Sequence, residues 1–595
     1  MADPISRRDW MKVVGAASAG ALVSGEVVLP EHASTAPAEI LPLTSTSEVY
    51  VPPRGRAFMK FSFDFPEPSV VFGDYRFGFL VFTDENCYGL DAGKLTVSAT
   101  SSGLRLTAGG LVWAGGQQRA AGTLTAELRR IGDVIEWEAV AELDRPIKAI
   151  TTVIRGVPRG SLSLAGGALF DPRDNEVLAG YPFGAGDLHG PGAASGIATP
   201  LVVVQAGPQL FVSLASLDDR VRPKRFYFQP GETSYRVEAI YEHDGWRRDS
   251  RVRLPAWRLA RTATFDAAMA AHAAHLERAF ALPAWETRAD VPPWMRRIAM
   301  VTTLHGMHYT GYIFNDYARM LEILRWMAAR IPGERVLVFV SAWDGRYYWD
   351  YPSYEPAPRM GGEEGFRRLV VEGHRLGFKI MPMFGANAAN RKLASWPRIA
   401  GGATEKIDGD VYNLNWVDWN NDRHQDGWLS YMNLGDESWR TWLEERIASI
   451  IERIGVDAYF LDIVGGHVND ARADMHEGTR RLVADLRARY PSVPAVGEMP
   501  YDALHAFIPL YHAGNGPAWR KYSRFFQHLS LPAPGRGSSG VHEAGWGRFD
   551  QTTLMIRDDA IPTLNVVDDT FDAHRDVMAE FISRVNARSA RTPSR

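Results

Sequence analysis

Hydrophobic and polar positions follow two different periods along the chain, and the change of period divides it into two parts. From residue 57 to about residue 259, apolar and polar residues alternate in short runs, most regularly at 134–143 and 235–241. Alternation with a period of two predicts strands with one buried face. Gly, Pro, Asp and Asn separate these runs at short spacing, as in an antiparallel β-sandwich. We therefore expect an N-terminal β-sandwich domain over residues 39–262.

Residues 264–282 are rich in alanine and carry apolar side chains at helical spacing. We expect a linker helix within residues 263–292 that bridges the two domains and packs on the second one. His272 and His275 lie on this helix. Because no partner ligands accompany them, a packing helix is favoured over a metal pair. Prolines follow the helix and mark the domain boundary.

Beyond residue 293 the pattern changes to short apolar runs that alternate with amphipathic helices. Strands are predicted at 298–304, 335–340, 378–384, 456–461, 495–497, 524–528 and 561–567. This alternation is typical of parallel α/β folds, and a right-handed repeat of such units closes into a barrel. The predicted fold class is therefore multidomain β plus α/β, with an antiparallel β-sandwich followed by a (β/α)₈ TIM barrel over residues 293–595. The pattern assigns the runs at 524–528 and 561–567 to strands six and eight and leaves strand seven unplaced.

Two carboxylates follow successive strands of this predicted barrel. Asp462 comes directly after the strand at 456–461, and Glu498 ends the strand at 495–497. The carboxyl ends of the strands form the catalytic face of a TIM barrel, and neighbouring strands lie about 4.8 Å apart. A retaining glycosidase needs two carboxyl groups about 5–5.5 Å apart, whereas a wider spacing would make Glu498 the base of an inverting enzyme. We expect Asp462 to be the nucleophile and Glu498 the acid/base. Loop capping or ion pairing is the structural alternative for each.

The segments Phe-Leu-Asp, ending at Asp462, and Val-Gly-Glu, ending at Glu498, resemble the nucleophile and acid/base signatures of retaining glycoside hydrolases of the α-amylase clan. In that clan the nucleophile follows the fourth barrel strand and the acid/base follows the fifth. The resemblance implies an α-linked substrate and net retention. The sequence departs from the clan at Phe460, where the clan has an arginine, and it carries no Asn-His-Asp triplet late in the chain.

Aromatic residues are concentrated in two loops that follow the second and third predicted strands. Aromatic faces hold sugar rings, while nearby acidic and amide groups bind hydroxyls; the alternative is ordinary packing under long loops. Substrate contacts are predicted for Trp343, Asp344, Tyr348, Trp349, Asn387, Trp416, Trp419 and Asp422. His467, His505 and Asp568 follow other predicted strands and are further candidates, although Asp568 could instead cap the last helix.

Composition and motifs exclude several other function classes. A formal net charge of −4, a pI near 6.5 and the lack of a basic block argue against nucleic acid as a partner. The sequence shows no P-loop, GxSxG elbow, zinc HExxH motif or Rossmann glycine fingerprint in the required context. The acidic residues and His424 within 418–426 could bind Ca²⁺, but their spacing does not match an EF-hand. We predict neither a cofactor nor a metal.

The N-terminus resembles a twin-arginine export signal. Residues 6–12 read SRRDWMK, an apolar run follows at 13–23, and Ala36–Ala38 offers a small-residue cleavage site. A disordered basic N-terminus is the alternative. We expect residues 1–38 to be removed and the mature protein to be periplasmic or extracellular, without a membrane span because the apolar run is too short. A single cysteine, Cys87, usually indicates a reducing compartment, but a protein exported in the folded state needs no disulfide.

Taken together, these patterns predict an exported glycoside hydrolase that acts on an oligosaccharide or polysaccharide. Two alternatives stay open: a non-catalytic carbohydrate-binding protein, and a metal-dependent hydrolase or lyase acting on an acidic polysaccharide. The fold alone does not separate these chemistries. The sequence gives no prediction of the sugar or of the oligomeric state.

Overall fold

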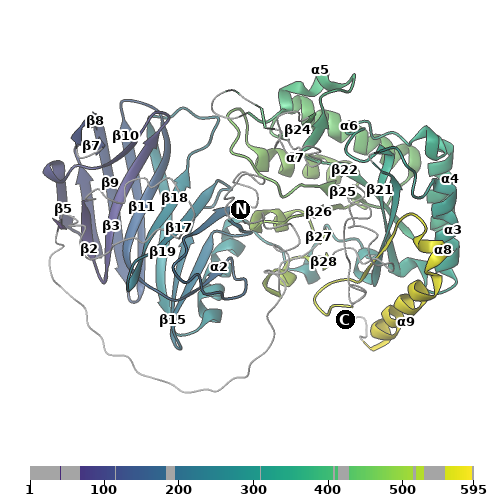
Figure 1. Cartoon of the computed structure of the whole chain (residues 1–595), viewed down its shortest axis with the longest axis horizontal. Helices are drawn as coiled ribbons and strands as arrows, with labels where there is room; N and C mark the ends of the chain where they lie inside the picture. The colour runs from purple at the N-terminus through teal and green to yellow at the C-terminus, as the bar shows by residue number, and fades with distance from the viewer. Residues whose placement is uncertain are drawn as a thin grey trace. The chain divides into compact units, whose positions relative to one another are not determined.

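The computed structural model describes residues 40–41, 68–113, 116–182, 195–308, 310–405, 409, 411–412, 428–512, 517–527 and 556–591. The chain forms two compact units that divide between Ala281 and Leu282 (Figure 1).

In its described residues, the first unit contains two sheets. One has 11 strands: β1 (Ile40–Leu41), β2 (Ser69–Phe72), β3 (Tyr75–Thr83), β4 (Cys87–Leu90), β7 (Leu111–Trp113), β8 (Gln118–Ala120), β11 (Ile147–Pro158), β13 (Val177–Tyr181), β14 (Ser195–Gly196), β17 (Lys224–Pro230) and β18 (Ser234–Glu242). The other has eight: β5 (Leu95–Ala99), β6 (Gly103–Ala108), β9 (Gly122–Ile131), β10 (Val134–Leu143), β12 (Ser161–Leu164), β15 (Leu201–Gly207), β16 (Leu210–Ser216) and β19 (Arg251–Thr262). Neighbouring strands run antiparallel throughout the described part of this unit, except for the β13–β14 pair.

Side chains from the two sheets meet in the core of the first unit. The Trp137 ring of β10 lies 5.3 Å from the Phe77 ring of β3, and its indole N–H donates to Thr152 Oγ1 of β11 at 2.9 Å. Trp257 of β19 lies 5.4 Å from Phe226 of β17. Strand β10 buries every second residue over most of its length, which is the alternation read from the sequence. The apolar faces of the two sheets therefore pack against each other.

Helix α2 (Phe265–Ala279) belongs to the first unit. Thr264 caps it, because its Oγ1 accepts a hydrogen bond from the Ala267 N–H at 3.2 Å. The helix packs against β15, β16 and β19, so the expectation that it packs on the second domain is wrong. Its His272 contacts Thr199 Oγ1 at 2.6 Å, and burial lowers the pKa of His272 to about 3. His272 is thus a neutral core residue.

The second unit is built on eight parallel strands arranged in chain order. They are β20 (Met300–Met307), β21 (Val336–Arg346), β22 (Lys379–Gly385), β25 (Tyr459–Asp462), β26 (Ala495–Glu498), β27 (Leu510–His512), β28 (Arg524–Phe526) and β29 (Thr563–Val566). Strand β20 also pairs with β29, and a parallel bridge joins Phe526 to Ile561. The Gln527 N–H donates to Ile561 O at 2.9 Å. The sheet is therefore a nearly closed, barrel-like structure.

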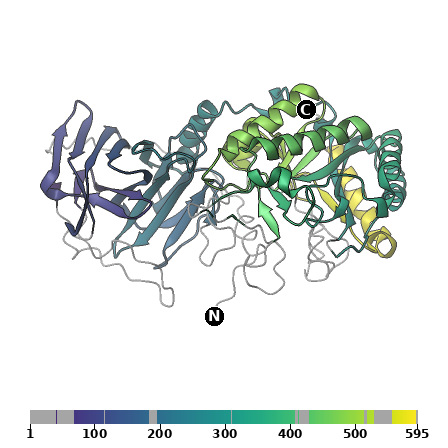
Figure 2. The ribbon, with the colours of Figure 1, turned by 90° about the horizontal axis from the view of Figure 1, so that it is seen from above.

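Helices connect the first strands of this sheet and lie on its outside (Figure 2). They are α3 (Tyr317–Ala328), α4 (Gly362–Arg375), α5 (Trp396–Ile399), α6 (Glu437–Ile454) and α7 (Met475–Arg489), with α8 (Thr570–Ala573) and α9 (Arg575–Arg591) after β29. The hairpin of β23 (Ala388–Asn390) and β24 (Leu429–Tyr431) lies between β22 and α6. Between β26 and β27, where every residue is described, the short 3₁₀ helix η8 (Asp502–Ala506) replaces an α-helix. The regular strand–helix alternation of the prediction is thus observed only in the first part of the barrel.

Three aromatic rings fill the inside of the barrel. Phe339 of β21 and Phe460 of β25 have ring centroids 4.5 Å apart, and Phe526 of β28 lies 6.3 and 6.4 Å from them. Because these strands are not neighbours in the sheet, their side chains meet across its interior. Phe460 therefore points inward, and it sets the orientation of the residues that follow it on β25.

Candidate active site

Asp462 and Glu498 lie at the carboxyl ends of the fourth and fifth barrel strands. In the parallel pair β25–β26, Leu461 is opposite Gly497, so the next residue of each strand is one of the two carboxylates. Side chains alternate along a strand, and Asp462 therefore shares the inward face of Phe460. Both residues are buried, with 4% of Asp462 and 6% of Glu498 exposed. The sequence-predicted pair is thus brought together at one end of the barrel.

The carboxylate of Glu498 is held from two sides. The Ile463 N–H donates to Oε1 at 3.2 Å, so the residue after Asp462 directly contacts the Glu498 side chain. His512, at the end of β27, has its Nδ1 3.5 Å from Oε2. The two carboxylates are therefore linked through the main chain, and a histidine adjoins the second one.

The residue after each carboxylate adopts a left-handed backbone conformation. The φ angle is 51° at Ile463 and 55° at Met499, although neither is a glycine. A β-branched residue is rarely found in this conformation, and such strain gathers at functional sites. Asn387 stabilises the first turn, because its Nδ2 donates to Ile463 O at 3.0 Å and to Gly466 O at 3.2 Å. Asn387, expected to contact substrate, instead positions the turn after Asp462.

Two glycines allow this turn to approach its neighbours closely. A Cβ on Gly465 would lie 1.5 Å from Met499 O, and one on Gly466 would lie 1.8 Å from Tyr431 Oη. The Gly465 N–H also donates to Glu498 O at 3.2 Å. Main-chain contacts, which need glycine here, therefore set the distance between the two strand ends.

Buried tyrosines surround the pair. Burial, followed by the negative charge of Asp462, raises the pKa of Tyr347 and of Tyr351 well above the usual value. Burial, followed by the charge of Glu498, raises the pKa of Tyr431. These phenols stay protonated. The Tyr347 hydroxyl donates to Tyr348 Oη at 3.1 Å, whereas the hydroxyls of Tyr351 and Tyr431 have no hydrogen-bond partner within the described residues and can donate to a ligand.

Asp344, near the end of β21, is a third buried carboxyl group. Burial is the main cause that raises the pKa of Asp344 to about 7, and the nearby charge of Asp350 adds to it. The charge of Asp344 in turn raises the pKa of Tyr351 and Tyr354, so it belongs to the same tyrosine cluster. Within the described residues its Oδ2 has no hydrogen-bond partner. Asp344 can therefore accept a hydrogen bond from a bound hydroxyl.

The other aromatic candidates differ in how accessible they are to a ligand. Trp343 is fully buried, stacks on Phe366 of α4 at 5.1 Å and donates its indole N–H to Met383 O at 2.9 Å. It packs between strand and helix, and its expected substrate contact stays a prediction. Tyr348 is buried in the tyrosine cluster, 5.5 Å from the ring of Tyr351.

Trp349 is partly exposed at the edge of this cluster. Its ring lies 4.7 Å from that of Trp428, and the Arg346 guanidinium lies 4.4 Å from its centroid. Part of the indole is therefore already covered by neighbouring side chains.

Three further candidates occupy distinct surroundings. His467 is buried, with its ring 6.3 Å from that of Tyr501. His505 is a core residue, contrary to expectation, since it stacks on Trp519 at 4.8 Å and burial lowers its pKa to about 3. Asp568 accepts a hydrogen bond from the Tyr312 hydroxyl at 2.8 Å, just beyond β29. Trp416, Trp419 and Asp422 lie outside the described residues.

Sequence reasoning missed His512. The sixth strand, β27, has only three residues, which is too short to show a period, and the segment at 524–528 was assigned in its place. That segment is β28, the seventh strand. A single histidine after so short a run gives no recognisable signal.

Within the described residues, no group of three or more His, Cys, Asp or Glu side chains has a metal-binding arrangement. The possible cation ligands at 418, 422, 424 and 426 fall outside that part of the chain. The described helices include none that is long and apolar enough to span a membrane.

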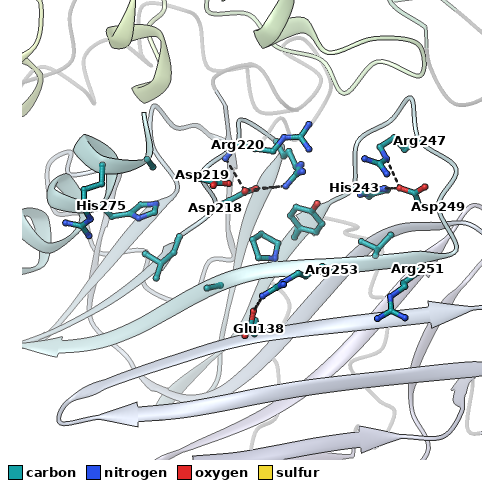
Figure 3. Close-up of a pocket in the computed structure, with 18 residues that line it drawn as sticks. Glu138, Asp218, Asp219, Arg220, His243, Arg247, Asp249, Arg251, Arg253 and His275 are labelled. Carbon is teal, nitrogen blue, oxygen red and sulfur yellow. Dashed lines mark hydrogen bonds and ion pairs between the residues drawn. The ribbon is translucent and has the colours of Figure 1, made fainter. Parts of the chain in front are cut away.

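A cavity of about 790 Å³ in the first unit is lined by charged residues (Figure 3). Its charges are largely paired with one another: Arg222 contacts Asp218 at 3.3 Å, and His243 and Arg247 contact Asp249 at 2.8 and 2.7 Å. Carboxylates fixed in this way are suited to stabilising loops.

No family model matches the sequence, and no curated protein matches it. Solved structures do match its fold. An alpha-N-acetylgalactosaminidase from Bifidobacterium bifidum, in complex with GalNAc, aligns with a TM-score of 0.60 and 13% identity over 87% of this chain and 90% of that chain. A GH36 alpha-galactosidase from Geobacillus stearothermophilus aligns with a TM-score of 0.51 and 10% identity over 90% of this chain and 77% of that chain. This chain has their fold. The resemblance to the α-amylase clan is not confirmed by these comparisons.

Proposed function

We propose that the protein is a retaining α-glycosidase in which Asp462 is the nucleophile and Glu498 the acid/base. The observation that carries this proposal is the placement of two buried carboxylates at matching ends of adjacent parallel strands. That end of a barrel is where catalytic residues gather. The barrel is of the TIM type in this proposal, with the N-terminal β-sandwich as its companion domain.

The reaction proceeds in two displacements. Asp462 attacks the anomeric carbon while Glu498 protonates the departing glycosidic oxygen, giving a covalent glycosyl ester and a free alcohol. Glu498, now ionised, then removes a proton from water, whose oxygen attacks the anomeric carbon and releases Asp462 as a carboxylate. The Ile463 N–H, 3.2 Å from Glu498 Oε1, stabilises the ionised form between the two steps.

The substrate we propose is an α-linked galactose or N-acetylgalactosamine residue of an oligosaccharide or polysaccharide. The names of the two fold neighbours support this class of sugar. Asp344 binds a sugar hydroxyl through its buried carboxyl group, and the protonated tyrosines around it supply donors. Contacts from Trp349, Trp416, Trp419, Asp422, His467 and Asp568 remain part of the proposal.

The test is hydrolysis of a panel of aryl glycosides: α- and β-galactosides, α- and β-N-acetylgalactosaminides, and α-glucosides. Asp462→Asn and Glu498→Gln keep the side-chain shape but remove the charge or the transferable proton. We expect each to lower kcat/KM by about 10²-fold or more, and NMR to show an α-configured first product. Glu355→Gln, which alters an ion pair with Arg446 and Arg453, is the matched control.

Full activity in both variants would show that this carboxylate pair is structural. A β-configured first product would show that the enzyme inverts the anomeric configuration instead of retaining it. If the wild type binds these sugars in calorimetry but hydrolyses none, the protein is a carbohydrate-binding protein.

We further propose export by the twin-arginine route, with residues 1–38 as the signal. Replacing Arg7 and Arg8 by lysine should keep the protein in the cytoplasm, as measured by cell fractionation. Export of this variant at the wild-type level would contradict the proposal.

A further inference from the structure

We propose that His512 is a positioning residue that donates a hydrogen bond to Glu498 and thereby lowers the cost of ionising it. This inference rests on the proposed function, because it concerns the proton that Glu498 transfers. The inference adds a residue of the sixth strand, β27, to the carboxyl groups carried by the second, fourth and fifth strands.

The strand register places His512 beside Glu498. In the parallel pair β26–β27, Glu498 is opposite His512, and both are the last residues of their strands. The Nδ1–Oε2 distance of 3.5 Å is slightly longer than an ordinary hydrogen bond. Catalytic hydrogen bonds are often long in an enzyme without substrate and tighten when substrate binds.

Aromatic packing fixes the orientation of the imidazole. The ring stacks on Phe526 with centroids 5.0 Å apart and an interplanar angle of 20°. It also lies edge-on to Phe460 at 6.2 Å. These two rings are part of the barrel interior, so they hold the plane of His512 while its Nδ1 faces Oε2.

Each oxygen of Glu498 thus faces one nitrogen: the Ile463 N–H at Oε1 and the His512 Nδ1 at Oε2. Two donors favour the ionised carboxylate, which opposes the effect of burial. Nδ1 acts as the donor in this arrangement.

The groups that face Glu498 come from several elements. Tyr431 from β24 and Tyr347 from the loop after β21 interact with its charge, and Asp462 adjoins it through the turn after β25. The phenols stay neutral and Asp462 is an acid. Of these facing groups, His512 is the one whose ring nitrogen lies 3.5 Å from Oε2, so its removal should have the clearest effect on the Glu498 proton.

The experiment compares the pH dependence of kcat/KM for the wild type, His512→Leu and His512→Asn on the best aryl glycoside. The basic limb of this profile reports the general acid of the free enzyme. Leucine removes the donor, whereas the asparagine amide places an N–H close to the Nδ1 position. In His512→Leu we expect the basic limb to move up by about one pH unit and kcat/KM to fall about ten- to hundredfold.

His512→Asn should return the basic limb to near its wild-type position, since it restores the donor without a titrating group. His374→Leu is the matched control, because His374 contacts Asp457 at 2.7 Å on the same barrel but does not contact Glu498. Its basic limb should match the wild type. Thermal unfolding of each variant separates loss of folded protein from loss of catalysis.

If the basic limb does not move in His512→Leu, or if it moves equally in His512→Leu and His512→Asn, then His512 is only a packing residue. A downward shift would show that His512 accepts rather than donates, and would also overturn the inference. Failure of the proposed function gives a different result, because Asp462→Asn and Glu498→Gln would then remain active.

Discussion

Carboxyl groups at the two ends of the barrel lie in opposite surroundings. At the amino end, Asp457 accepts hydrogen bonds from His374 at 2.7 Å, Lys379 at 2.8 Å and the Ile380 N–H at 2.9 Å. Burial by itself would raise the pKa of Asp457, but the bonds from His374 and Lys379 outweigh it and lower the pKa.

At the carboxyl end of the barrel, backbone N–H groups, phenols and a histidine lie near the carboxyl groups, and the ammonium that Lys379 supplies to Asp457 has no counterpart among these groups. There burial raises the pKa of Asp344 to about 7. These two surroundings suit a carboxyl group to two different roles. A carboxylate held by cations keeps its charge and stabilises the fold, whereas a carboxyl group among neutral donors can exchange a proton near neutral pH.

The largest expected contrast in activity and stability comes from replacing a carboxylate by an amide at each end of the barrel. Asp462→Asn should lower kcat/KM by about 10²-fold or more with little loss of stability. Asp457→Asn should leave kcat/KM of the folded protein within about twofold but lower the free energy of unfolding by about 3 kcal/mol, because it leaves His374 and Lys379 without their partner. Aryl glycoside kinetics and urea unfolding measure the two effects. Equal losses of activity would remove the distinction between the two ends.

Asp344 should make the protein less stable as pH rises. Its folded-state pKa of about 7 lies above the unfolded value, so the native state binds the extra proton between about pH 4 and pH 7. Stability is therefore lost as pH rises through this window. Asp344→Asn should remove up to about 4 kcal/mol of this dependence. Urea unfolding at a series of pH values checks it, and identical pH curves for the variant and the wild type would contradict the burial argument.

The close approach between the turns after Asp462 and Glu498 can be tested with one methyl group. Gly465→Ala would place Cβ 1.5 Å from Met499 O, and a main-chain atom cannot yield without moving a catalytic strand end. We expect kcat/KM to fall by about tenfold or more, since small misplacements of reacting groups are costly. Gly455→Ala is the control: no atom lies within 4 Å of a Cβ at this position, and its φ of 85° should cost about 1 kcal/mol of stability and no activity.

The smallest expected effect is at acid pH. The lowered pKa of Asp457 means that its stabilising contribution is present above its unfolded pKa and is lost as pH falls through the folded value. The stability that Asp457 contributes therefore rises with pH, whereas the stability that Asp344 contributes falls with pH. In Asp457→Asn, the fall in stability below about pH 4 should be shallower than in the wild type, as measured by thermal unfolding. A steeper fall in the variant would contradict this assignment.

Most of the barrel could be predicted because its strands are apolar runs with helices between them. The same logic located Asp462 and Glu498, since an acidic residue directly after an apolar run stands at a strand end. β27 was missed because the run at 524–528, which is the equally short β28, was assigned to the sixth strand in its place, and His512 was missed with it.

Two other differences have specific physical causes. The packing of Trp343 was missed because aromatic composition does not say which way a ring points. Ala342 before it has a φ of 50°, and an alanine in the sequence gives no sign of this left-handed conformation. The packing of α2 was also missed, because an amphipathic helix shows that it has an apolar face but not which sheet covers that face.

The contact between Gly465 and Met499 has a consequence for how this site can evolve. The spacing of Asp462 and Glu498 depends on main-chain atoms, while the groups that we propose to meet the sugar are side chains such as Asp344 near the end of β21 and Tyr348 in the loop after it. Under the proposed function, substitutions in this segment can change which sugar is accepted while Asp462 and Glu498 stay in place. Chemistry and selectivity are thereby separable traits in this barrel, and a descendant can acquire a new substrate without having to rediscover the reaction.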